Sequence, residues 1–418
     1  MDRVQLLDKI TKQYLSSRDF NGLPISIIGG DFQSTRESLR QLVQEGAVVL
    51  NFGDRHPNPY ILAFEPEPSE EQVKKLDAMT PPEPQYEEGG PLTVQTNPLI
   101  CCAYPSRDHL ASVVDQTQYR RAPFTLLLAL GEPQLSYRAF NLRVLELYRN
   151  DPRYSYETDD VHGRISEKKE GSLEHPDDVL LQTFGFAYDE RIENRYVAVF
   201  LRYLSDLTPE HQQRWKLEEH TGRTLLHPGY AQQTAGEWPE KQSIFTAFCE
   251  ELRIINEMTV RMCGKQVFRR TYHSFTKPER FGFLVRPTTR EYEDFVQLLD
   301  KMMADNLNRL FFCARGERKG CGTIVLLEEW LSARVRLSDP APKDQMLKVF
   351  RDIRAERSPP AHHVRDDEWD DTYFSRQRET ILKAYDAVRT LRLILANHPL
   401  ARTVEVPDWL FKGEIWTF

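Results

Sequence analysis

The sequence predicts a soluble α+β protein built from several domains, and three observations lead to that prediction. The chain has 418 residues, which is more than one hydrophobic core usually organises. Apolar residues recur at helical spacing near both ends of the chain. Between the ends, short apolar runs and helical stretches follow one another too irregularly for a doubly wound sheet, and such an order is typical of α+β folds.

Composition and charge exclude several classes of protein. Hydrophobic residues make up 40% of the chain, so it can bury sizeable cores and is not disordered throughout. The formal net charge of −8 excludes a generally basic protein that coats DNA, though not a local basic face. The six cysteines contain no CxxC pair, so neither a disulfide framework nor a zinc ribbon is predicted.

The apolar segments are too short to cross a membrane. The longest run, Phe124 to Leu130, is broken by Thr125 and falls well below the ~20 residues that span a bilayer. Charges interrupt every apolar stretch of the first residues, MDRVQLLDKITKQYLSS, so the core of a signal peptide is missing. We therefore expect a cytoplasmic protein with reduced thiols and no membrane partner.

Residues 1–67 predict a small domain of helices that ends in a β-hairpin. Apolar residues recur at helical spacing over 2–17 and again over 35–45. The apolar runs 47–52 and 60–64 flank the turn residues GDRHPNP and predict two paired strands. This order of elements resembles the winged helix-turn-helix family, in which one helix enters the major groove and the hairpin touches the backbone.

The resemblance implies a nucleic-acid contact through the helix over 35–45 and the tip of the hairpin. The side chains that would make this contact are Thr35, Arg36, Arg40, Gln41 and Arg55. Winged helices also serve as docking modules, and few basic residues lie on the expected contact face. Both a DNA or RNA partner and a protein partner therefore remain open for this domain.

The next two segments predict a linker and a central domain. Residues 68–91 are dominated by Pro, Glu and Gly, which is typical of a linker. Residues 92–287 predict a central α+β domain whose function the sequence does not indicate. Its expected elements include buried strands at 99–104 and 124–130 and helices at 137–148 and 242–262. Because no glycine-rich phosphate loop occurs, we expect neither a P-loop ATPase nor a Rossmann enzyme, and no cofactor.

One polar group in the central domain has the residue types of a metal site. Asp159, Asp160 and His162 lie together beside Gly163. Carboxylates and imidazole can bind a metal ion, but polar residues beside a glycine more often shape a turn. We expect a turn here and no metal site.

Residues 288–418 predict a C-terminal bundle of four helices. Each expected helix carries an apolar stripe, and four such helices can enclose one core. The acidic run DDEWDD precedes the last helix, where acids complement the helix dipole. The four helices are expected at 288–311, 323–333, 343–357 and 372–397.

The end of the third expected helix carries a motif of known type. It reads FRDIRAERSPPAHHVR, in which four residues separate Arg357 from His362. This Arg-x4-His pattern resembles the HEPN family (higher eukaryotes and prokaryotes nucleotide-binding). The resemblance implies a metal-independent endoribonuclease of bacterial antiviral defence or toxin–antitoxin systems, acting on RNA as a homodimer or as a subunit of a defence complex. His362 would be the acid and base and Arg357 the phosphate clamp, with support from Arg354, Ser358 and His363.

The residue types suit that chemistry, but the motif departs from the family. Histidine can move protons near neutral pH, and arginine can hold phosphate oxygens as charge builds. Two prolines follow Ser358, however, and they end the helix at once. The alternative is therefore a non-enzymatic regulator or scaffold whose degenerate bundle only dimerises. The placement of Arg357 and His362 decides between the two.

Overall fold

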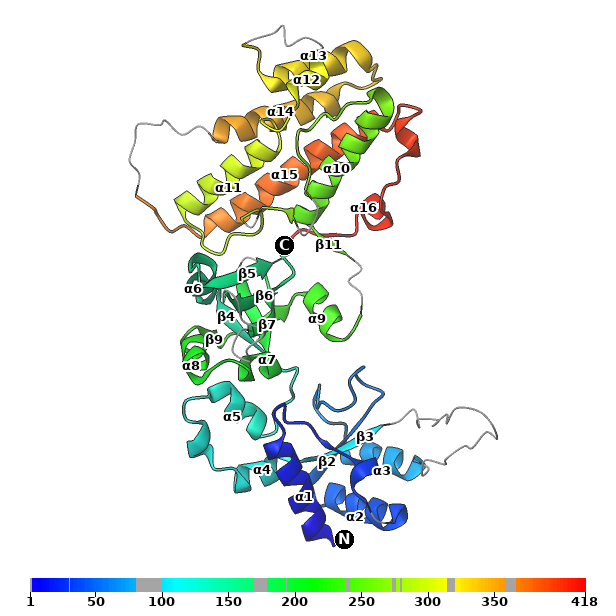
Figure 1. The fold of residues 1–418 in the computed structure, drawn as a ribbon, viewed down its shortest axis with the longest axis vertical. Helices are drawn as coiled ribbons and strands as arrows, with labels where there is room; N and C mark the ends of the chain where they lie inside the picture. The colour runs from blue at the N-terminus through cyan, green and yellow to red at the C-terminus, as the bar shows by residue number, and fades with distance from the viewer. Residues whose placement is uncertain are drawn as a thin grey trace, which may run out of the picture.

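The fold is α+β, as predicted, in a computed structural model of the chain. Figure 1 shows three parts along the long axis: an N-terminal sheet with helices, a second sheet in the middle, and a layer of long helices at the other end. The described residues are 2–418 apart from 30, 80–99, 159, 169–178, 193, 238–240, 273–275, 279, 314–319 and 358–365. No helix among them is long and apolar enough to span a bilayer.

The N-terminal part is a three-stranded antiparallel sheet packed against helices. Its central strand β3 (Cys101–Pro105) pairs with β1 (Leu23–Pro24) and with β2 (Val48–Phe52). The other elements are α1 (Arg3–Ser16), the 3-10 turn η1 (Ile25–Ile27) and α2 (Phe32–Gln44). Asp31 caps α2, because its carboxylate accepts from the backbone N of Ser34 at 2.8 Å.

The prediction of a second hairpin strand at residues 60–64 is wrong. Residues 47–52 contain β2, but residues 60–64 form no strand, and β3 pairs with β2 instead. The apolar run turns toward the middle sheet, where Ile61 is buried in one cluster with Phe200. Asn51 holds this turn, because its side-chain amide donates to the carbonyl of Ile61 at 2.9 Å. Tertiary packing thus overrides the local hairpin signal.

Part of the predicted linker is a packed helix, α3 (Ser69–Ala78). Leu76 is fully buried in the cluster that α1, α2 and the sheet form. The side-chain oxygen of Gln72 accepts a hydrogen bond from the backbone N of Leu50 at 2.7 Å. Residues 69–78 therefore belong to the N-terminal core, while 80–91 lie outside the described residues.

The middle part is an antiparallel sheet with short helices around it. Its strands run in the order β5-β6-β7-β8-β4-β9, and β10 pairs with β7. The strands are β4 (Tyr137–Asn141), β5 (Tyr154–Thr158), β6 (His162–Glu167), β7 (Val179–Tyr188), β8 (Arg195–Phe200), β9 (Glu219–His220) and β10 (Leu225–Leu226). The helices are α4 (Arg107–Val113), α5 (Pro123–Ala129), α6 (Glu146–Asn150), α7 (Leu201–Ser205), α8 (Pro209–Leu217) and α9 (Pro228–Thr234).

Of two predicted elements in the middle part, one has the opposite type and the other is only half helical, since the 3-10 turn η3 (Leu142–Leu145) and α6 follow β4. Residues 124–130, expected as a strand, lie in α5, where Phe124 and Leu128 share one buried face. Residues 137–148, expected as a helix, begin with β4, whose Phe140 packs on Trp215 with ring centroids 4.9 Å apart. A short apolar run is compatible with both a helix and a strand, and packing against neighbouring elements determined the secondary structure of these two segments.

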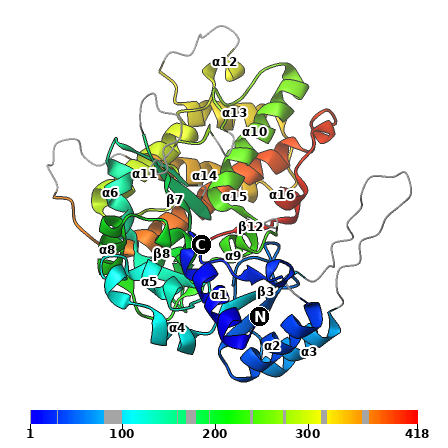
Figure 2. The same cartoon turned by 60° about the horizontal axis from the view of Figure 1, so that its bottom comes forward.

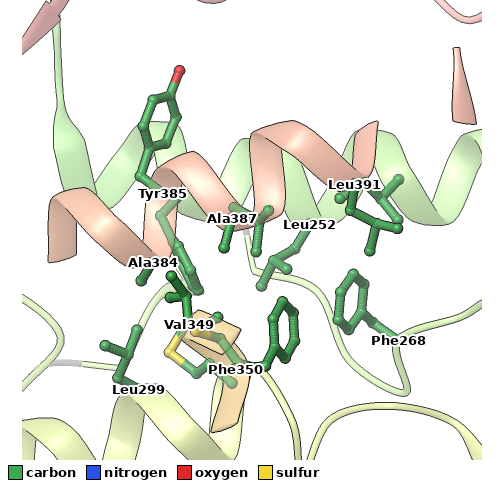
Figure 3. Packing of buried hydrophobic residues seen from close by; sticks show 14 of the residues in the cluster. Leu252, Phe268, Leu299, Val349, Phe350, Ala384, Tyr385, Ala387 and Leu391 are labelled. Atoms are coloured by element: carbon green, nitrogen blue, oxygen red, sulfur yellow. The ribbon is translucent and has the colours of Figure 1, made fainter. Parts of the chain in front are cut away.

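The C-terminal part is a helical layer with one large core. Figure 3 shows Leu252 of α10 (Ile244–Cys263), Leu299 of α11 (Thr289–Met302) and Phe350 of α14 (Ala341–Glu356) packed below α15 (Thr372–Leu395). Figure 2 shows α10 beside α15 from a second side. The remaining elements are α12 (Arg309–Phe312), α13 (Thr323–Arg334), α16 (Asp408–Lys412) and the strand pair β11 (Gln242–Ser243) with β12 (Ile415–Trp416). The C-terminal core thus begins at α10 and not at residue 288.

The first helix expected in this part is two helices. The structure ends α11 at Met302 and begins α12 at Arg309. Between them the buried Asn306 binds the backbone of Arg270: its side-chain oxygen accepts from N at 2.9 Å and its amide donates to O at 2.7 Å. These bonds hold residue 306 away from a helical path. The expected helices at 323–333, 343–357 and 372–397 are confirmed within two residues at each end.

Candidate functional site

Arg357, the arginine of the HEPN-like motif, lies at the C-terminal end of α14 and is bound by acids. Its Nη1 donates to Oδ2 of Asp300 at 2.6 Å, and also to Asp305. Asp300 sits on α11 and is fully buried, while a third of the Arg357 side chain is exposed. The hydrogen bonds to Asp300 and then Asp305 raise the pKa of the Arg357 guanidinium above its usual value. The guanidinium that the resemblance implies as a phosphate ligand is thus already bound by two aspartates of the chain.

Arg354, one turn earlier on α14, joins the same cluster. Its guanidinium donates to the two carboxylate oxygens of Asp300 at 3.3 and 3.4 Å and also to Asp305. Two arginines and two aspartates therefore balance one another. Among the predicted catalytic and supporting residues, the structure brings together Arg354 and Arg357. Ser358, His362 and His363 lie outside the described residues.

The N-terminal residues predicted to touch nucleic acid are held within the chain. Arg40 pairs with Asp77 at the end of α3, and Nη1 of Arg36 donates to the backbone carbonyl of Asp77 at 3.3 Å. Helix α3 thus lies along the face of α2 that was expected to read bases (Figure 2). The other three predicted residues also bond internally: Thr35 to the Gly29 carbonyl, Gln41 to Glu37, and Arg55 to the Glu65 carbonyl.

Asp160, weighed above as part of a metal site, forms a buried polar junction. It adopts a positive φ of 77° between β5 and β6 and is 2% exposed. Its carboxylate binds Lys277 and accepts from the Ser243 hydroxyl at 3.0 Å and from the backbone N of Phe283 at 3.3 Å. Asp159 lies outside the described residues, and the rest of the described chain holds no group of three or more His, Cys, Asp or Glu suited to a metal ion. Asp160 therefore joins the sheet to the helical layer.

A histidine in the middle part sits in an arrangement that the sequence did not predict. Nδ1 of His211 lies 2.5 Å from the hydroxyl of Tyr148, which accepts a hydrogen bond from Nε1 of Trp215 at 3.0 Å. Burial, and secondarily the charge of Arg214, lowers the pKa of His211. The ring lines a small cavity of about 280 Å³ with Arg153 and Arg214. Burial thus favours the neutral form of the His211 ring, which a packed hydrogen-bond chain holds in place.

A larger cleft of about 470 Å³ lies between the middle sheet and the start of α15. Three arginines line it, Arg191, Arg195 and Arg378, against one aspartate, Asp371. Aromatic rings form part of its wall: Tyr188, Phe283, Phe374 and Phe418. Sequence reasoning missed this cleft, because its residues come from separate segments and form no motif.

Comparisons with known proteins find no family model, no curated protein and no solved structure that matches the chain. The functional hypotheses therefore depend on the contacts described above.

Proposed function

We propose that the chain is a non-enzymatic regulator or scaffold, in which the HEPN-like bundle serves assembly. The acid-bound state of Arg357 carries this proposal. A metal-free ribonuclease needs a cation available to the phosphate as charge develops. Here a phosphate would compete with a carboxylate that has no access to water, because Asp300 is fully buried. Withdrawing Arg357 from Asp300 costs about 1–2 kcal/mol, because Arg354 stays on the carboxylate, and this cost opposes that exchange.

The N-terminal part would dock a protein partner. The succession α1-β1-η1-α2-β2-β3 with strand order β1-β3-β2 supports a winged-helix-like arrangement, with a long excursion where the wing would be. Base reading needs free donors on α2, yet Arg36 and Arg40 are bound by Asp77. This occupation favours protein docking over contact with DNA or RNA. The resemblance further implies a homodimer through the C-terminal helices, or a place in a bacterial defence complex.

A ribonuclease is the second candidate, and the position of Arg357 favours it. The residue caps the end of α14 directly before the segment with His362, as the resemblance implies, and a third of its side chain reaches solvent. RNA could meet the guanidinium there if a second copy or a substrate displaced Asp305, the more exposed of its two acids.

Incubation of the purified chain with mixed RNA, with and without EDTA, tests the proposal. We expect no cleavage above background, and identical results for His362→Ala. Cleavage that survives EDTA, leaves 2′,3′-cyclic phosphate ends and is lost by at least about a hundredfold in His362→Ala would establish the ribonuclease instead. His398→Ala is the control, since His398 follows α15 and is exposed. Light scattering at micromolar concentration tests assembly: a dimer is expected, and a lone monomer contradicts the assembly role.

A further inference from the structure

The cleft between the middle sheet and α15 has the size of a small-ligand site. Four regions far apart in the chain build it: the β7–β8 hairpin, the segment around Phe283, the first two turns of α15, and Phe418. Its volume of about 470 Å³ falls within the range of pockets that hold ligands as large as a mononucleotide. Arg357 does not line it, and its residues have no part in the function proposed above.

The cleft is lined by more positive than negative side chains. Arg191, Arg195 and Arg378 face one acidic residue, Asp371, whose carboxylate already accepts from Nε1 of Trp369 at 2.9 Å. In the described parts of the chain, none of these three arginines forms an ion pair with an acidic side chain. Arginines on a surface usually gain such partners or water, but these converge on one hollow. An anion is the ligand that this charge favours.

Arg195 has an unfilled hydrogen-bonding position. Its guanidinium lies over the ring of Phe283, 3.5 Å from the centroid, and its Nη2 donates to the hydroxyl of Tyr188 at 2.9 Å. Its Nη1 is buried and has no hydrogen-bond partner among the described residues. Burial also lowers the pKa of this guanidinium. A buried donor without an acceptor is costly, so this nitrogen indicates a missing partner.

The rest of the wall is suited to a flat ring. Phe374 of α15 and Phe418 are placed beside Tyr188 and Phe283 around the same hollow. The rings of Tyr188 and Phe418 are already in edge contact, with centroids 5.2 Å apart. A simple inorganic anion would use the arginines alone and leave this apolar surface uncovered. A ligand with a planar ring and an anionic group would use both.

We propose that this cleft binds a nucleoside phosphate, with the phosphate held by Arg195 and Arg378 and the base against the aromatic wall. Arg191, in the exposed β7–β8 turn, adds charge at the entrance. A free mononucleotide and the 5′-phosphorylated end of a single strand present this same chemistry. The site adds a ligand to the chain that neither the scaffold role nor the ribonuclease role requires.

Calorimetric titration of the full chain with AMP, inorganic phosphate and a 5′-phosphorylated RNA trinucleotide tests the site. We expect AMP, the trinucleotide or both to bind, and phosphate alone to bind at least about tenfold more weakly. Arg378→Gln should weaken binding by about tenfold or more, because it removes one arm of the phosphate clamp. Lys383→Gln on the same helix is the matched control, since its charge is exposed and paired with Glu379 outside the cleft.

The outcomes separate the two sources of the ligand and can overturn the site. Binding of AMP alone assigns the cleft to free nucleotides, and tighter binding of the trinucleotide assigns it to strand ends. No binding of either at about 1 mM, phosphate binding as tightly as AMP, or equal effects of Arg378→Gln and Lys383→Gln would each overturn it. Because the side chain of Arg378 forms no hydrogen bond or ion pair with the described part of the chain, the variant is expected to keep the wild-type melting temperature. The titration involves neither RNA cleavage nor dimerisation, so its failure leaves the proposed function standing.

Discussion

Oδ2 of the fully buried Asp300 accepts a hydrogen bond from Nη1 of Arg357 at 2.6 Å, across the contact between α11 and α14. The arginine that the motif marks as catalytic is thereby a structural partner of a buried acid. Arg354 also binds Asp300, so either arginine can still neutralise this carboxylate when the other is removed. This redundancy sets the size of the effects expected on removing them.

Arg357→Ala is expected to lower the free energy of unfolding by about 1–2 kcal/mol, because Asp300 loses one bond but keeps Arg354. Arg354→Ala with Arg357→Ala is expected to cost about 3–5 kcal/mol, since the buried carboxylate then has no cation. Urea unfolding at pH 7 measures both. Arg351→Ala is the control on α14, where an exposed pair with Glu328 contributes less than about 1 kcal/mol. Equal stability of Arg357→Ala and Arg351→Ala would refute the structural role.

The buried pair of Glu251 on α10 and Arg392 on α15 predicts a pH-dependent defect. Nη2 of Arg392 donates to Oε1 of Glu251 at 3.1 Å, and Glu251 is fully buried. Arg392→Leu is expected to cost about 3–5 kcal/mol at pH 7, because the carboxylate keeps its charge without a partner. Glu251→Leu with Arg392→Leu should recover most of that loss. A double variant no more stable than the single one would contradict the account.

The sign of the pH effect follows from the pKa of Glu251. Burial raises this pKa, and the bonds to Arg392 oppose the rise. Without Arg392 the folded pKa climbs further above its unfolded value, so protonation favours the folded state. The destabilisation in Arg392→Leu should therefore shrink as the pH falls from 7 toward 5. Unfolding curves at the two pH values, compared with wild type, measure this change.

His211 predicts a loss of stability in mild acid. Its pKa is lowered by burial and by the charge of Arg214, so the folded state favours the neutral ring, whose Nδ1 is hydrogen-bonded with the Tyr148 hydroxyl. The stabilisation is present above the unfolded pKa of about 6.5 and is lost as the pH falls below it. His211→Gln should flatten the fall of unfolding free energy between pH 7.5 and 5.5, whereas His398→Gln should leave the wild-type slope. If both variants keep that slope, the ring does not carry the effect.

A fragment of residues 1–67 is expected not to fold. The strand β3 lies between β1 and β2, and the fragment ends well before it. It also lacks α3, whose Leu76 is fully buried in the same core. A fragment of residues 1–130 contains all of these elements and should unfold in a cooperative thermal transition. Circular dichroism measures both fragments. If the shorter fragment also shows a cooperative transition, the domain boundary that the sequence predicts at residue 67 is correct.

Helices with long apolar stripes were predictable from the sequence, and strand partners were not. The stripes at 242–262 and 372–397 correspond to α10 and α15, because helical periodicity and caps act within one segment. The sequence predicted that residues 60–64 pair with β2, because they are the next apolar run along the chain. The true partner, β3, follows an excursion that contains α3, and no local pattern encodes a pairing across it.

The sequence by itself determined that the chain is α+β, that its C-terminal part is helical and that Arg357 ends a helix there. Those features arise from periodicity, capping and proline, which act over a few residues. Only the tertiary structure decided that Arg357 meets Asp300, that α3 covers the polar face of α2, and that Arg195 and Arg378 line one cleft. These pairs are distant in the chain, and they meet because packed apolar faces bring α11 to α14, α3 to α2 and the middle sheet to α15.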